Sequence, residues 1–144
     1  MWPVLFLAFL QAAASPAAVA ELTVEADGRQ WGAFARIVPP AEDAATVTLE
    51  DGWIDPAFLE LWWPAARKSA PGLEPGVHAF DDGDCRGRRV EVRQALGPGR
   101  MSRVRSWTLL GACPVAWEVA GEPEDGRLPL GSLTFRVEGV GSAM

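Results

Sequence analysis

The chain has 144 residues, with 19 acidic residues against 13 Lys and Arg, which gives a formal net charge of −6. This length is enough for one domain and no more. The negative charge disfavours general electrostatic binding to nucleic acid or to anionic membranes, so we predict no nucleic-acid partner.

The first twenty residues have the layout of a secretory signal peptide. They carry no charged side chain, contain a short apolar run at residues 4–10, and end in an Ala18-Val19-Ala20 motif. The run is too short to span a membrane, which takes about 20 apolar residues. No Lys or Arg precedes it, and the alternatives are an apolar N-terminal strand or a misassigned start codon. We predict cleavage after Ala20 and a mature domain of residues 21–144 in the periplasm or outside the cell, with no membrane insertion.

The first mature segments alternate apolar and polar residues, which indicates strands. Residues 21–26 and 30–38 flank an Asp27-Gly28 turn pair and predict a hairpin, which Pro39-Pro40 ends. A further strand is expected at residues 44–50.

One helix is predicted to begin at Asp55-Pro56, because Asp suits the N-cap and Pro the first helical position. Its apolar side chains, at spacings of three and four, are Phe58, Leu59, Trp62 and Trp63. Pro64 kinks or ends it. We interpret the paired tryptophans as a core face, and the alternative is a platform on which a ligand stacks.

Residues 69–87 are rich in Gly, Pro and Asp and predict a long loop with a short extended piece at 77–80. Within it, Asp81-Asp82-Gly83-Asp84 offers carboxylates for a cation. The cluster lacks the alternating acidic spacing and the distal Glu of a calcium loop, which favours a plain acidic turn.

The second half of the mature chain predicts four more strands. They are residues 88–96, 101–113 before a proline-broken corner at Cys113-Pro114, 115–119 around Trp117, and 132–140. Arginines on the first two of these strands form a local basic face, which is usually solvated or paired with acidic residues. The total is about seven strands and one helix. We therefore predict a mainly β domain, an antiparallel β-sandwich or small β-barrel with one flanking helix.

The two cysteines, Cys85 and Cys113, suit an exported protein, in which a disulfide forms and persists. Such a bridge would stabilise the fold by about 3 kcal/mol on the chain-entropy model. The alternative is a pair of buried free thiols.

No set of residues fills the roles of a known catalytic device. The one histidine, His78, lies in the least regular part of the chain, and the sequence contains no G-x-S-x-G turn. Gly97-Pro98-Gly99 does not open a helix, which argues against a phosphate-binding loop. One His with two distant Cys makes a weak zinc case, and no pair of carboxylates stands out. We predict no catalytic residue, no metal ligand, no cofactor and no enzymatic activity.

The order of these segments resembles the contractile phage tail-tube family, which is related in fold to the Hcp tube proteins of type VI secretion. The similarity spans residues 22–140 and rests on segments distributed along the chain. They are the Asp-Gly hairpin at 24–34, the VTLEDGWIDPAFLELWW segment with Trp62 and Trp63, the Pro114-Val115-Ala116-Trp117 corner, and the closing Val137-Glu138-Gly139. The resemblance implies a small barrel whose subunits join edge to edge into hexameric rings that stack into a tube.

The chain departs from the tail-tube pattern in four places. A short connection at 39–45 replaces the long excursion that helps rings to stack, residues 69–87 are inserted, and a cysteine pair and an export segment are added. We therefore expect an exported structural or interaction protein that self-associates, in rings or a tube-like complex, or binds another protein. The alternative is a monomeric periplasmic or secreted β-sandwich that binds a ligand or protein through its Trp-rich face or the 69–87 loop.

Overall fold

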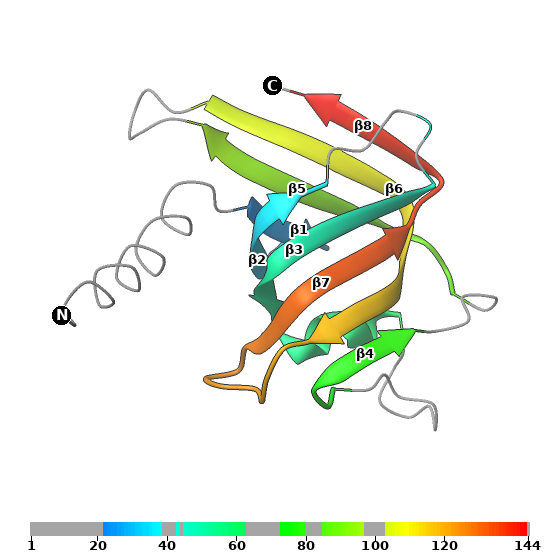
Figure 1. Cartoon of the computed structure of the whole chain (residues 1–144). Coiled ribbons are helices and arrows are strands. Elements are labelled where there is room, and N and C mark those ends of the chain that lie inside the picture. The colour runs from blue at the N-terminus through cyan, green and yellow to red at the C-terminus, as the bar shows by residue number, and fades with distance from the viewer. Residues whose placement is uncertain are drawn as a thin grey trace, which may run out of the picture.

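The computed structural model describes residues 22–38, 43, 45–62, 73–79, 85–96 and 103–143 (Figure 1). The predicted signal peptide with Ala20, Trp63 and the Asp81–Asp84 cluster lie outside these residues. The elements are β1 (Leu22–Ala26), β2 (Arg29–Ile37), β3 (Thr46–Ile54), the 3-10 helix η1 (Pro56–Leu61), β4 (Gly76–Ala79), β5 (Arg88–Leu96), β6 (Arg103–Val119), β7 (Leu128–Arg136) and β8 (Gly139–Ala143).

Six of the strands close into an antiparallel barrel. Their order is β6-β5-β1-β2-β3-β7, and β7 pairs again with β6 to complete the circle. The two remaining strands, β4 and β8, each pair with β6. The prediction of a mainly β domain with a small barrel and one flanking helix is confirmed, with eight strands in the described part of the chain.

Two Asp-Gly pairs make the tight turns of this barrel. Asp27 and Gly28 between β1 and β2 have φ angles of 53° and 76°, and Asp125 and Gly126 before β7 have nearly the same values, 53° and 75°. A two-residue hairpin turn with positive φ at both positions matches the twist of the flanking strands. The predicted first hairpin is therefore confirmed.

The predicted corner at Cys113-Pro114 is wrong, because β6 is one strand of 17 residues that passes through it. Pro114 lies at an irregularity, since the register with β7 shifts between Pro114 and Ala116. On the other edge of β6, pairing with β5 ends at Ala112 and pairing with β4 begins at Ala116. Proline is tolerated at such a bulge because its missing N–H removes no regular ladder bond.

The predicted last strand at 132–140 is also wrong, because it is two strands separated at Val137 and Glu138. The Val137 N–H donates to the Ala45 carbonyl at 2.9 Å, and the Glu138 N–H donates to the Leu110 carbonyl at 2.8 Å. The chain thus leaves β3 and moves along β6 at this point. β7 pairs with both β3 and β6, whereas β8 pairs with β6.

A 3-10 helix, η1, lies across one end of the barrel (Figure 1). The Asp55 side chain accepts a hydrogen bond from the Ala57 N–H at 2.9 Å, so its predicted role as N-cap is confirmed. The buried Phe58 ring lies 5.8 Å from Trp31, 5.0 Å from Trp62 and 6.3 Å from Phe135 between centroids. This aromatic cluster closes the barrel end with side chains.

Candidate functional site

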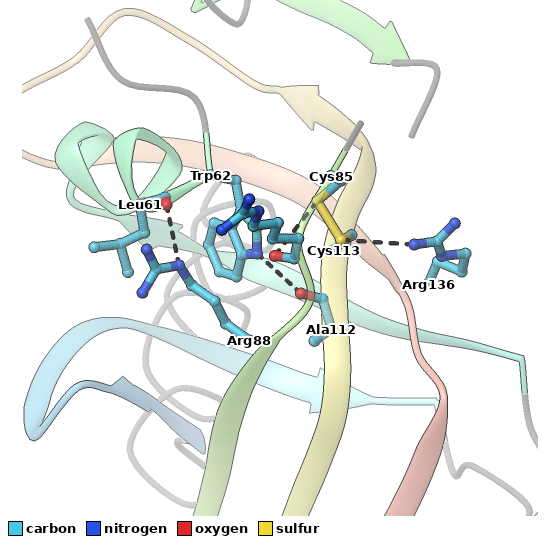
Figure 2. The surroundings of a disulfide bond; sticks show 8 residues. Leu61, Trp62, Cys85, Arg88, Ala112, Cys113 and Arg136 are labelled. Atoms are coloured by element: carbon cyan, nitrogen blue, oxygen red, sulfur yellow. Dashed lines mark hydrogen bonds between the residues drawn. A yellow bond between two sulfur atoms is a disulfide. The ribbon is translucent and has the colours of Figure 1, made fainter. Parts of the chain in front are cut away.

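The predicted cysteine pair forms the disulfide Cys85–Cys113, with a Cα–Cα distance of 6.3 Å. Cys113 is fully buried, and Cys85 lies just before β5. The bridge therefore joins the start of β5 to β6 where the neighbour on that edge of β6 changes from β5 to β4 (Figure 2).

Two glycines lie beside the bridge, each two residues along the chain from a bridged cysteine. A Cβ atom added at Gly87 would overlap the backbone of Gly111, and Gly111 itself has φ +60°. An added Cβ at Gly111 would also overlap the Glu138 side chain. The two backbones approach so closely because Gly87 has no side chain, and the positive φ of Gly111 favours glycine there as well.

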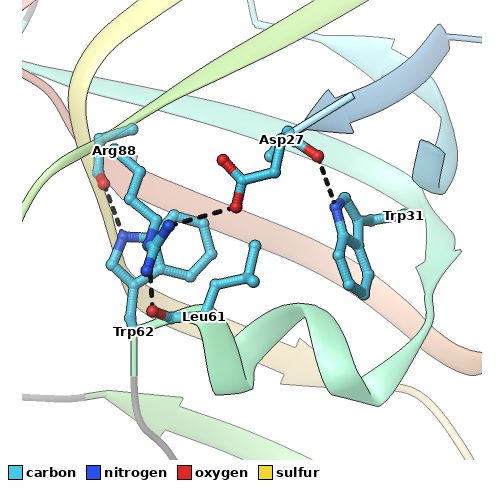
Figure 3. A network of polar contacts seen from close by, with 7 residues as sticks. Asp27, Trp31, Leu61, Trp62 and Arg88 are labelled. Atoms are coloured by element: carbon cyan, nitrogen blue, oxygen red, sulfur yellow. Dashed lines mark hydrogen bonds and ion pairs between the residues drawn. The ribbon is translucent and has the colours of Figure 1, made fainter. Parts of the chain in front are cut away.

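The end of η1 is attached to both strands beside the disulfide (Figures 2 and 3). The Trp62 indole Nε1 donates to the Ala112 carbonyl at 2.9 Å, and the Arg88 Nε donates to the Leu61 carbonyl at 3.0 Å. Arg88 also pairs with Asp27 across 3.2 Å. Because Trp62 is buried in these contacts, its interpretation as a core residue is confirmed, and it offers no platform for a ligand.

Three other residues singled out from the sequence lie in β6 and β4. Pro114 and Trp117 are buried in β6. His78 lies on β4 opposite Trp117, and its Nε2 contacts the Glu74 carbonyl at 2.7 Å. Among the described residues, no group of three or more His, Cys, Asp or Glu side chains could hold a metal ion.

The predicted basic face spans β5 and β6, and on β5 its arginines are paired with carboxylates. Arg93 lies 3.5 Å from Glu25 and 3.2 Å from Glu91, and Arg89 also lies 3.2 Å from Glu91. These residues, with the Arg88–Asp27 pair, line a surface cleft of about 560 Å³. Three arginines face three carboxylates, so the cleft attracts neither sign of charge strongly.

A second charged face lies on β2 and β3. Hydrogen bonds from Arg36 to Glu50 and to Asp51 raise the pKa of the Arg36 guanidinium above its usual value. These pairs link β2 to β3 on the solvent-exposed outer face of the sheet.

A third feature, which was not predicted, lies where β3 ends beside the connection from β6 to β7. The Arg127 guanidinium covers the Trp53 ring at 4.2 Å from its centroid. Glu122, Glu124 and Asp125 complete a cleft of about 550 Å³. The alternation of apolar and polar residues in 46–54 could have placed Trp53 on the outer face. The cleft itself could not be predicted, because the other residues that line it lie about 70 positions later in the sequence.

The edge of β8 was also missed by sequence reasoning. This strand pairs only with β6, so no strand of the described residues lies beside its other edge. Its five residues carry no charge, and Leu110 next to it on β6 is 48% exposed. Figure 1 shows β8 at the opposite end of the molecule from η1. Sequence reasoning did not separate β8 from β7, because the break at Val137 is set by the strands that pair with each part of the chain and not by the local sequence.

No helix in the described part of the chain has the length and apolar character needed to cross a bilayer.

No family model matches the chain, and no curated protein or solved structure matches it either.

Proposed function

We propose that this chain is an exported structural or interaction protein with a tail-tube-like barrel, which associates with itself or with another protein through strand edges. The observation that carries the proposal is the uncharged edge of β8, which has no partner strand among the described residues. Backbone N–H and C=O groups on such an edge are ready to pair with another strand.

Export is supported by the disulfide, because such bridges persist mainly in oxidising compartments. It is also supported by the signal-like first twenty residues. Intact-mass measurement of the secreted protein tests both, since cleavage after Ala20 and the Cys85–Cys113 bond each change the mass by a known amount.

Ring formation is the arrangement that the family resemblance implies. In a ring, every subunit offers two different surfaces, one to each neighbour. The strands β4 and β8 lie on opposite edges of β6 and near opposite ends of it, so they are suitable for this purpose.

The test is the oligomeric state of the mature protein, residues 21–144. Light scattering and sedimentation velocity over a range of concentrations should reveal association, and electron microscopy should show whether rings form. A protein that remains monomeric at its highest soluble concentration, and that captures no strand-forming partner, would contradict the proposal.

The cleft at Trp53 favours a second candidate, a monomeric exported module that binds a ligand or a protein. It combines an aromatic ring, one arginine and three carboxylates on the outer surface. Binding there would be weakened by Trp53→Ala and unaffected by changes to β8, which separates the two candidates.

A further inference from the structure

We propose that the Cys85–Cys113 bond is a thiol–disulfide exchange site. A dithiol from outside the chain attacks the sulfur of Cys85, and Cys113 leaves as a thiolate beside the guanidinium of Arg136. The site lies within one chain, so it does not depend on the strand-edge association proposed above.

The two sulfurs of the bridge differ in exposure, and this difference decides which of them is attacked. Cys113 lies within β6 and has no exposed surface, whereas Cys85 lies before β5 and is partly exposed. Exchange begins with the attack of a thiolate on a sulfur that it can reach. An external thiol therefore forms its bond to Cys85, and Cys113 becomes the leaving sulfur.

The leaving sulfur has a cationic neighbour that the strand ladder places beside it. Arg136 is the partner of Cys113 in the β6–β7 ladder, and its Nη2 lies 3.7 Å from the Cys113 Sγ (Figure 2). A neighbouring arginine stabilises a thiolate, and a more stable thiolate leaves faster in exchange. The same charge offsets the burial of Cys113, which by itself disfavours the charged form of the thiol.

The other charged groups near the bridge do not take this role. Arg88 is engaged by the end of η1, through a hydrogen bond of 3.0 Å, and by Asp27 at 3.2 Å. Glu138 is exposed and its side chain lies against Gly111, so solvent and salt screen the effect of its negative charge. Arg136 is therefore the group whose removal should change the exchange reaction.

The reaction balances with a dithiol as the only co-reactant. In the first step a thiolate of the dithiol bonds to the Cys85 sulfur, the Cys85–Cys113 bond breaks, and its electron pair moves to the Cys113 sulfur. In the second step the other thiol of the reagent attacks the mixed disulfide, and Cys85 leaves. The dithiol is oxidised to a disulfide by two electrons, which reduce the protein bridge. Of its two protons, one ends on Cys85 and one enters the solvent.

Opening of the bridge should loosen β4, because the bridge closes a small ring at the end of the β4–β6 ladder. Five residues lie between Ala79 and Cys85, and two lie between Cys113 and Ala116, the ladder partner of Ala79. The ladder has four residue pairs, and Val77 within it is 74% exposed. A strand that buries so little surface belongs to the parts of a protein that open locally.

The rate of reduction by dithiothreitol tests the role of Arg136 in the mature, oxidised protein. Arg136→Gln should react at least about threefold more slowly than the wild type, whereas Arg136→Lys, which retains the charge, should stay within about twofold of it. Arg105→Gln is the matched control and should not change the rate, because Arg105 lies on the same strand as Cys113 but about 26 Å away at the usual rise per residue. Mass spectrometry after acid quenching and alkylation measures the rates, and circular dichroism verifies that each variant is folded.

A second measurement identifies the attacked sulfur and the state in which it is attacked. Brief treatment with 2-mercaptoethanol, followed by an acid quench and peptide mapping, should find the adduct on Cys85. The rate should also stay nearly constant at low urea concentrations. Attack that required unfolding would accelerate at least about fivefold per molar of urea, because urea lowers the free energy of unfolding.

Hydrogen exchange tests the consequence for β4. In the reduced protein the amides of β4 should exchange at least about tenfold faster than in the oxidised protein, while those of β1 and β2 should be unchanged. Equal reduction rates for the wild type and Arg136→Gln, an equal loss of rate in Arg136→Lys, an adduct on Cys113, a steep urea dependence, or unchanged exchange of β4 would each overturn the proposal. All of these results can be obtained from single chains, so their failure leaves strand-edge association standing, and the oligomeric state tests that association separately.

Discussion

The closed barrel and the strand β8 use the same backbone geometry in opposite ways. In the barrel each strand pairs on both sides, and its inward side chains are large and apolar, as Phe135 and Trp117 show. β8 pairs on one side and has mostly small residues. The difference indicates that fold stability resides in the barrel, while β8 can change without disturbing it. Substitutions in the two regions should therefore separate folding from association.

The largest effect is expected from Phe58→Ala, in the centre of the aromatic cluster. The ring is fully buried and contacts Trp31, Trp62 and Phe135, so its removal leaves a cavity and should lower the free energy of unfolding by about 3–5 kcal/mol. Urea denaturation measures this change. Leu110→Ala beside β8 is the control and should cost less than about 1 kcal/mol, because Leu110 is half exposed. Equal losses at both positions would contradict the division into two regions.

Removal of the disulfide is next in size. The cysteines are 28 residues apart, and Cys85→Ala with Cys113→Ala should lower the free energy of unfolding by about 3 kcal/mol. Alanine avoids placing a hydroxyl at the buried position 113. Thermal unfolding with and without a reductant checks the cause, since reduction should destabilise the wild type and leave the double variant unchanged. Association through the β8 edge by the folded fraction should persist, because β8 lies on the other edge of β6.

Trp62→Phe should have a moderate effect. It keeps most of the buried ring and removes the Nε1 donor, which leaves the Ala112 carbonyl without its 2.9 Å partner. We expect a loss of about 1–2 kcal/mol in the free energy of unfolding. Trp31→Phe removes the corresponding bond to the Ala26 carbonyl and should give a similar loss. If Trp62→Phe is neutral, the indole bond does not hold η1 to β6.

The smallest effects compare two glycines. Gly28 has φ +76° in the β1–β2 turn, so Gly28→Ala should cost about 1 kcal/mol in unfolding free energy. Gly141 is not in this region of φ, and an added Cβ there meets open space. Gly141→Ala should therefore change the stability of the monomer by less than about 0.5 kcal/mol. Chemical denaturation at low protein concentration, where the chain is monomeric, measures both.

Sequence reasoning predicted the features that depend on neighbouring residues. The Asp27-Gly28 turn and the Asp55 cap each follow from a few adjacent side chains, and both were found. The buried position of Trp62 followed from helical spacing, although η1 is a 3-10 helix. The pairing of Cys85 with Cys113 needed only that they are the two cysteines of the chain.

The errors occurred where the partner strand decides the structure. Pro114 ends a strand in most contexts, but here it falls at a bulge between two ladders of β6. No residue near Val137 disfavours a strand as proline does. The strand breaks there because the backbone changes its hydrogen-bonding partner from the start of β3 to β6. The Trp53 cleft and the β8 edge were missed for the same reason, since their neighbours lie far away in the sequence.

The close approach of Gly87 and Gly111 has a consequence for recognising distant members of this lineage. Each glycine is two residues from a bridged cysteine, so the chain carries Cys-x-Gly before β5 and Gly-x-Cys within β6. A descendant that keeps the bridge and this backbone contact should keep Gly87, because a methyl group there would collide with the Gly111 backbone, and should favour glycine at position 111, where φ is +60°. The paired tripeptides, with a strand hairpin between them, therefore form a search pattern that should outlast the divergence of the remaining sequence.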